Sequence, residues 1–122
     1  MNIITQSTNL TLTPAIEQYL VKKLVALEKF IDPADSGAQA AVELEKTTEH
    51  HRSGNIFRAE INLHVANGDF RAEMTDEDLY AAIDLMKDEI ARVLTEYHDR
   101  ERTLKRKGGQ EVKKMLREEK IL

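Results

Sequence analysis

A strict alternation of apolar and polar residues between positions 57 and 74 constrains this chain most. Apolar side chains occupy every second position from Phe57 to Val65 and again from Phe70 to Met74, with charged or polar residues between them. A period of two predicts two strands that share one apolar and one charged face. The intervening Asn67-Gly68 pair favours a two-residue hairpin turn, because both positions tolerate positive φ. We therefore expect an antiparallel sheet that helices cover on one face only.

Two longer segments have the 3.6-residue period of helices. Thr13-Pro14 suits the cap and the first position of a helix whose apolar stripe continues to Ile31. Asp32-Pro33 ends it, since the residue before proline is excluded from helical geometry. A second helix begins in the acidic segment 75–78, and its stripe continues to Tyr97.

Two more β-prone segments, residues 2–7 and 39–46, complete the pattern, and residues 47–55 read as a polar loop. The element order is therefore β-α-β-β-β-α. It predicts an α+β fold, a four-stranded sheet with two helices packed side by side on one face.

Composition limits the functional classes. The 122 residues suit one domain, and the absence of cysteine excludes thiol catalysis, cysteine zinc sites and disulfides. No apolar run is long enough to span a membrane, and the first ten residues lack a secretory pattern. We expect a cytoplasmic protein that does not associate with membranes.

Positive charge is concentrated at the C-terminal end. Residues 1–98 carry 9 Lys/Arg against 17 Asp/Glu, whereas residues 99–122 carry 9 against 5. The densest part is the segment 100–107, and Gly108-Gly109 follows as an expected break in the helix. We therefore divide the chain into a domain, residues 1–100, and a basic, flexible tail, residues 101–122.

One motif gives the chain a family likeness. Residues 78–84 read Asp-Leu-Tyr-Ala-Ala-Ile-Asp, directly after the predicted hairpin. Together with Thr13, Ile16 and Tyr19 at helical spacing and the segment 27–30, this motif resembles the ribosome hibernation factors. That family includes the short hibernation-promoting factors and ribosome-associated inhibitor A (protein Y).

The resemblance carries several expectations. It implies a fold like that of double-stranded-RNA-binding domains. It also implies binding in the decoding channel of the small ribosomal subunit, through ribosomal RNA, with ribosomal proteins as candidate further partners. Such a factor blocks mRNA and tRNA and inhibits translation under stress or in stationary phase. Neither an enzymatic activity nor a cofactor is implied. The 22 residues after Arg100 are too few for the dimerisation domain of the family's long members, so we expect a short form, monomeric in solution. Glu96 departs from the basic residue common there.

Binding to RNA phosphates requires an array of cations rather than one special residue. Helical spacing places Lys22 and Lys29 on one face of the first helix with Lys23 at its edge. It also places a second group on one flank of the last helix, beside Tyr80, which is suited to stacking on a base. We take the RNA-binding residues to be Lys22, Lys23, Lys29, Tyr80, Lys87, Arg92, His98, Arg100, Arg102 and Lys105. Asp84 is expected to orient a cation such as Lys87, Arg58 or Lys46.

Two alternatives remain open. The first alternative to a ribosome-binding factor is a double-stranded-RNA-binding module that does not act on ribosomes. The second is a protein-interaction module whose tail folds on a partner. His50-His51, His64 and His98 lack the spacing of a metal site and are expected at the surface. Glu43 and Glu45 read as the solvated face of the sheet rather than a catalytic pair.

Overall fold

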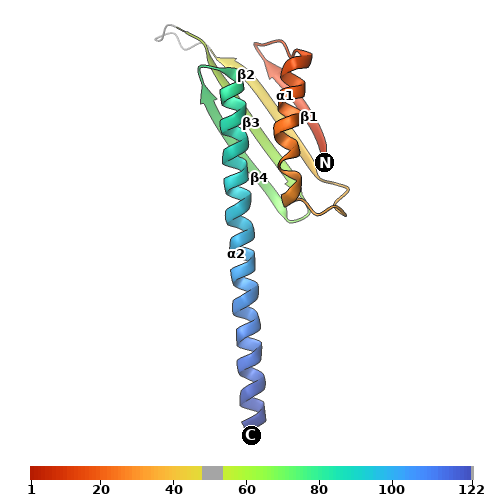
Figure 1. The fold of residues 1–122 in the computed structure, drawn as a ribbon, viewed down its shortest axis with the longest axis vertical. Helices are drawn as coiled ribbons and strands as arrows, with labels where there is room; N and C mark the ends of the chain where they lie inside the picture. Colours follow the sequence, from red (N-terminus) through yellow and green to blue (C-terminus); the bar gives the residue numbers. More distant parts are fainter. Residues whose placement is uncertain (48–53, 122) are drawn as a thin grey trace.

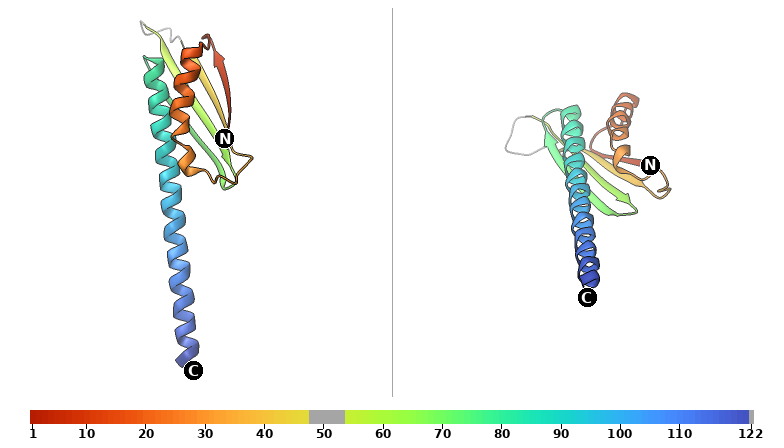
Figure 2. Two further views of the ribbon diagram at one scale, coloured as in Figure 1. Left: turned by 45° about the vertical axis from the view of Figure 1, so that its right-hand side comes forward. Right: turned by 60° about the horizontal axis from the view of Figure 1, so that its bottom comes forward.

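The fold is a four-stranded sheet with two helices on one face, as Figures 1 and 2 show. This computed structural model describes the backbone of residues 1–47 and 54–121, and the side chains of residues 1–47, 54–109 and 111; His50-His51 lie outside these ranges. The elements are β1 (Asn2–Thr8), α1 (Pro14–Val25), the 3-10 turn η1 (Glu28–Phe30), β2 (Gln39–Thr47), β3 (Ile56–Val65), β4 (Gly68–Asp76) and α2 (Leu79–Ile121). The predicted fold class and element order are confirmed.

The strands follow one another in the order β1-β2-β3-β4. β1 runs parallel to β2, because α1 carries the chain back across the sheet between them, whereas β2–β3 and β3–β4 are antiparallel. The register sets Val42 opposite Ile61 and Ile61 opposite Ala72, so apolar residues align across the sheet. All three side chains are buried in the core.

The core lies between this apolar sheet face and the two helices. The apolar stripe of α1 supplies Leu20 and Leu24, and that of α2 supplies Ile83 and Ile90, all fully buried. Truncating one such leucine or isoleucine to alanine costs about 2–5 kcal/mol. In the part of the chain that the structure describes, no helix covers the opposite sheet face, which stays open to solvent (Figure 2). The expectation that helices cover one face only is confirmed.

The first helix is shorter than its sequence pattern. Thr13 caps it as predicted, because the Thr13 hydroxyl accepts a hydrogen bond from the Ile16 N–H at 3.2 Å. The α-helix ends at Val25, however, and the chain tightens into η1 before Pro33. The predicted extension to Ile31 is wrong, and the regular spacing between Lys22 and Lys29 ends with it.

The hairpin turn lies one residue earlier than predicted. Val65 pairs with Gly68, so the two turn residues are Ala66 and Asn67. Gly68 opens β4 with a φ of 144°, a conformation that favours glycine. The Ala66 N–H donates to the Asp35 carboxylate at 2.8 Å, which ties the turn to the loop before β2.

The start and the interior of α2 also correct the sequence reading. Residues 75 and 76 belong to β4, and the Asp78 carboxylate accepts from the Tyr80 N–H at 3.3 Å where the helix begins. α2 continues through Gly108 and Gly109 to Ile121 and projects well beyond the sheet (Figure 1). The expected break at the two glycines is therefore wrong. Among the described residues, no helix combines the length and apolar character needed to cross a membrane.

Candidate nucleic-acid interface

A compact polar cluster lies where α1 and α2 run side by side. The Asp84 carboxylate on α2 accepts a hydrogen bond from the Tyr19 hydroxyl at 2.7 Å, and the Lys23 ammonium lies 3.2 Å from the same oxygen. The same ammonium lies 5.3 Å from the centre of the Tyr19 ring. The Tyr19 ring meets Tyr80 edge to face, with ring centres 4.8 Å apart. We call Tyr19, Lys23, Tyr80 and Asp84 the seam cluster.

Three members of the seam cluster, Tyr19, Lys23 and Asp84, stabilise one another's usual charge state. The hydrogen bond from Tyr19, followed by the contact with Lys23, lowers the pKa of Asp84. The hydrogen bond to Asp84 is the first cause that raises the pKa of Tyr19, and likewise the first that raises the pKa of Lys23. At neutral pH the cluster therefore holds a carboxylate, an ammonium and a neutral phenol.

The seam brings two predicted RNA-binding residues together. Lys23 is half-buried, with 33% of its side chain exposed, and Tyr80 is 37% exposed. Lys87, one turn beyond Asp84, is close enough for its charge to help lower the pKa of that carboxyl. Its ammonium lies 3.4 Å from Asp88, an exposed neighbour. Lys23 and Tyr80 thus both lie against Tyr19, and part of each side chain is open to solvent.

Three further predicted residues border the two helices. Lys22 is exposed on α1. Lys29 lies in η1, with its ammonium 5.2 Å from the centre of the Phe30 ring. The Phe30 ring also contacts His98 of α2, whose ring stacks on it with centres 5.8 Å apart. His98 therefore packs against η1 and is only partly exposed.

Arg92 is the predicted residue whose charge is most fully compensated. Its guanidinium donates to Glu89 and to Glu96, each at 2.6 Å. The contact with Glu89 is the main cause that raises the pKa of Arg92, and it lowers the pKa of Glu89. Glu96, the acidic departure noted in the sequence, thus neutralises a cation of its own helix.

The remaining predicted residues lie on the part of α2 beyond the sheet. Leu94 is the last fully buried residue of α2 among the side chains that the structure describes, and Tyr97 packs edge to face on Phe70 of β4 with ring centres 5.0 Å apart. We call residues 99–109 the arm. The arm carries five cations against Asp99 and Glu101, and all five are exposed: Arg100, Arg102, Lys105, Arg106 and Lys107. Arg102 pairs with Asp99.

The open face of the sheet has the opposite charge. Arg58 on β3 donates to Glu45 at 2.8 Å, to Glu43 at 2.9 Å, to Glu60 at 3.0 Å and to Glu73 at 3.4 Å. Arg71 on β4 contacts Glu60 at 2.6 Å and Glu73 at 2.7 Å. With Asp69, five carboxylates face two guanidiniums. The expectation that Glu43 and Glu45 lie on the outer sheet face is confirmed, although both are engaged by Arg58.

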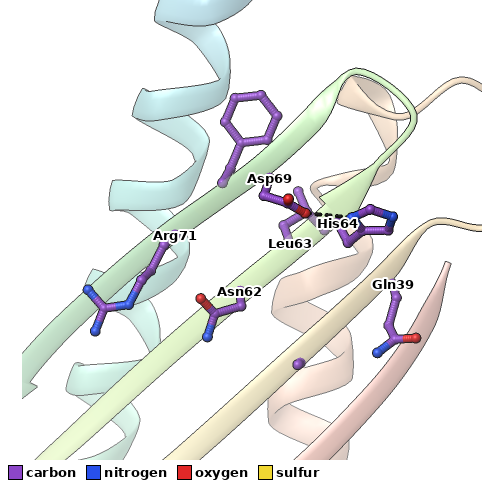
Figure 3. A pocket seen from close by; sticks show the side chains of 8 residues that line it. Gln39, Asn62, Leu63, His64, Asp69 and Arg71 are labelled. Atoms are coloured by element: carbon purple, nitrogen blue, oxygen red, sulfur yellow. Dashed lines mark hydrogen bonds and ion pairs between the residues drawn. The ribbon is translucent and has the colours of Figure 1, made fainter.

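A shallow pocket of about 310 Å³ lies on the same open face (Figure 3). Gln39, Ala41, Asn62 and Arg71 are among the residues that line it. His64 contacts Asp69 at 2.5 Å at one end. Each predicted RNA-binding residue belongs to α1, η1 or α2, so this pocket contains none of them.

Sequence reasoning missed the main contact of the seam. Asp84 was expected to orient Lys87, Arg58 or Lys46, but its hydrogen-bonding partners are Tyr19 and Lys23 of α1. Arg58 is bound on the opposite face of the sheet. The available signal was that Tyr19 and Asp84 each border an apolar stripe, and helices that lie side by side bring such borders together.

Comparisons with known proteins give the same classification. The family model described as Sigma 54 modulation protein / S30EA ribosomal protein matches residues 3–102. The ribosome hibernation promoting factor of Klebsiella oxytoca is 34% identical over 92 residues, covering 75% of this chain and 87% of that protein. The ribosome hibernation promotion factor of Staphylococcus aureus is 32% identical over 105 residues, covering 85% of this chain and 52% of that protein.

A solved structure agrees in fold. The N-terminal domain of Thermus thermophilus Protein Y is 34% identical and superimposes with a TM-score of 0.64, covering 80% of this chain and 99% of that one. The resemblance first seen in the segment 78–84 is thereby confirmed. On sequence and on fold together, this chain belongs to the Sigma 54 modulation protein / S30EA ribosomal protein family.

Proposed function

We propose that this protein is a ribosome hibernation factor. It binds the small ribosomal subunit in the decoding channel, where the folded domain excludes mRNA and tRNA and so inhibits translation under stress or in stationary phase. It acts by occupancy, without a catalytic step or cofactor, as a cytoplasmic monomer. Residues 1–100 form the ribosome-binding domain, and residues 101–122 add a basic extension.

The separation of charge is the observation that supports this proposal. The open sheet face has five carboxylates against two guanidiniums, whereas the arm has five cations against two acids. RNA phosphates attract the arm and repel the sheet face, so an acidic protein binds RNA in one orientation. The family membership and the named relatives identify the ribosome as the RNA-containing partner.

Co-sedimentation with purified small subunits at moderate salt tests the proposal. We expect the protein to travel with the subunits and to inhibit translation in a purified system. Protein that stays at the top of the gradient, or ribosomes that translate normally in its excess, would refute it. Equal affinity for free RNA duplex and for small subunits would favour the double-stranded-RNA-binding alternative.

Matched neutralising variants test which face binds. Lys22→Gln and Arg71→Gln remove the same charge from exposed side chains on opposite sides of the molecule. We expect Lys22→Gln to weaken binding and to reduce the slope of log K against log salt by about 0.7–0.9, the value for one phosphate contact. Arg71→Gln should leave both unchanged. Equal losses would contradict the assigned face.

Removal of residues 101–122 tests the basic extension. We expect the truncated protein to bind small subunits more weakly and with a lower salt slope, because four of the five arm cations are lost. Complete loss of binding with an intact domain would instead support the interaction-module alternative, in which the tail carries the partner contact.

A further inference from the structure

The seam cluster has a feature that charge alone does not explain. A binder of phosphates gains from every cation, yet Asp84 places a carboxylate 3.2 Å from Lys23, at the centre of the predicted RNA-binding residues. The carboxylate contacts two side chains of the neighbouring helix rather than solvent alone. Its effect on RNA binding therefore depends on whether it repels the ligand or organises the groups that bind it.

The contacts of Asp84 extend to both surface groups of the seam. On one side it fixes the ammonium of Lys23. On the other it fixes the Tyr19 hydroxyl, and the Tyr19 ring in turn packs edge to face with the ring of Tyr80. Two ring-centre distances, 5.3 Å and 4.8 Å, keep the Lys23 ammonium within about 10 Å of the Tyr80 ring. One carboxylate thus orders a cation and an exposed aromatic ring together.

We propose that Asp84 is a positioning residue that holds Lys23 and, through Tyr19, Tyr80 ready to bind one unpaired nucleotide of ribosomal RNA. Lys23 contacts the phosphate and the exposed part of the Tyr80 ring stacks on the base. Unstacked bases that rest on aromatic side chains are the usual target of sequence-dependent RNA binding. This inference rests on the proposed function and assigns a site and a nucleotide form within it.

The relative size of two effects decides the sign. Ordering a flexible side chain during association typically costs about two- to twelvefold in affinity, and Asp84 removes that cost for Lys23 and for Tyr80. A screened charge one side-chain length from a phosphate weakens binding by less than about threefold. Positioning therefore outweighs repulsion, so loss of the carboxylate should weaken binding although the protein becomes more positive.

Asp88→Asn provides a matched control. Asp88 lies one turn further along α2, is 70% exposed and contacts the Lys87 ammonium at 3.4 Å. Both Asp→Asn variants add the same charge and keep the side-chain shape. In small-subunit titrations we expect Asp84→Asn to bind about three- to tenfold more weakly than wild type. Asp88→Asn should bind equally or up to about threefold more tightly.

A double-variant cycle separates positioning from a purely structural role. In a Lys23→Gln, Tyr80→Leu background, where both surface groups are absent, Asp84→Asn should change the affinity by less than about twofold. A loss of the same factor in both backgrounds would overturn the proposal, as would an Asp84→Asn variant that binds as well as wild type. Far-UV circular dichroism checks the fold of each variant.

Asp84→Glu keeps the test decisive if Asp84→Asn does not fold. It preserves the charge and displaces the carboxylate by one methylene, so we expect a weaker loss of binding in the same direction. Wild-type affinity of Asp84→Glu would then overturn the inference. If the wild-type protein itself does not bind small subunits, the proposed function fails as well. If the wild type binds and Asp84→Asn binds equally, this inference alone fails.

Discussion

Replacement of Arg58 by methionine tests the charge network of the open sheet face. Methionine retains much of the aliphatic stem of Arg58 and removes every ion pair. Of the four carboxylate partners, Glu45 and Glu60 are the best shielded, with 24% and 18% of their side chains exposed. Glu43 and Glu73 are 34% and 38% exposed. Hydrogen bonds between charged groups contribute more when they are shielded from water.

These contacts give an expected loss of stability. About 1 kcal/mol for each of the two shielded contacts and about 0.5 kcal/mol for each of the other two sum to roughly 3 kcal/mol. For about 100 folded residues, this loss lowers Tm by roughly 12 °C. Arg71→Met should cost only a small fraction of that loss, since 55% of the Arg71 side chain is exposed on the edge strand β4.

Urea unfolding followed by circular dichroism measures both variants in low salt and in about 1 M salt, where exposed charge pairs are screened. Most of the stability loss in Arg58→Met should persist in high salt, because only 17% of the Arg58 side chain is exposed and its ion pairs are therefore poorly screened by salt. If Arg58→Met loses no more stability than Arg71→Met, or less than about 1 kcal/mol, the assignment of shielded ion pairs is refuted.

Three further predictions concern other parts of the molecule. The pKa of Glu60 is lowered from 4.5, first because Arg71 donates a hydrogen bond to this carboxylate. The stability that ionised Glu60 contributes is therefore complete above pH 4.5 and is lost as the pH falls through the lower pKa of the folded state. Glu60→Gln should therefore flatten the acid side of the stability curve, measured by urea unfolding from about pH 6 to about pH 3. Gly109→Ala should stabilise the helical conformation of the arm by up to about 1 kcal/mol, since an added Cβ has no neighbour within 4 Å. Amide exchange in residues 100–109 measures this gain, and faster exchange would contradict it. Tyr19→Phe removes the 2.7 Å hydrogen bond to Asp84 and should raise the pKa of that carboxyl, which a carboxylate NMR titration detects; an unchanged value would contradict the assigned bond.

The regular patterns of the sequence predicted the fold well. The alternation in residues 57–65 and the two helical stripes correctly predicted β3 and the packed faces of α1 and α2. The position of the hairpin turn and the extent of the helices were predicted less well, because contacts between residues distant in sequence help to decide them. The hairpin turn is held at Ala66 by the carboxylate of Asp35, and no pattern around Asn67-Gly68 reveals that bond. Glycine lowers helix propensity by about 1 kcal/mol, yet α2 continues through both glycines of the arm.

The candidate interface was predictable as a composition but not as a geometry. Helical spacing identified Lys23 and Tyr80, and in the structure both contact Tyr19. Helical spacing did not pair Tyr19 with Asp84, because these residues are 65 positions apart and only the packing of α1 against α2 brings them together. It also left Arg92 as a binding residue, although Glu89 and Glu96 neutralise it at one-turn spacing.

Because α2 is unbroken, one stiff helix joins the domain to its extension. An α-helix advances 1.5 Å and turns about 100° per residue, so the distance and the rotational phase between the seam and the arm are both fixed. One residue inserted near Asp99 would point every arm cation in a new direction, whereas four would nearly restore the original phase about 6 Å further out. A receptor that contacts both the seam and the arm would therefore depend on the distance and the rotational phase between them as well as on their charge.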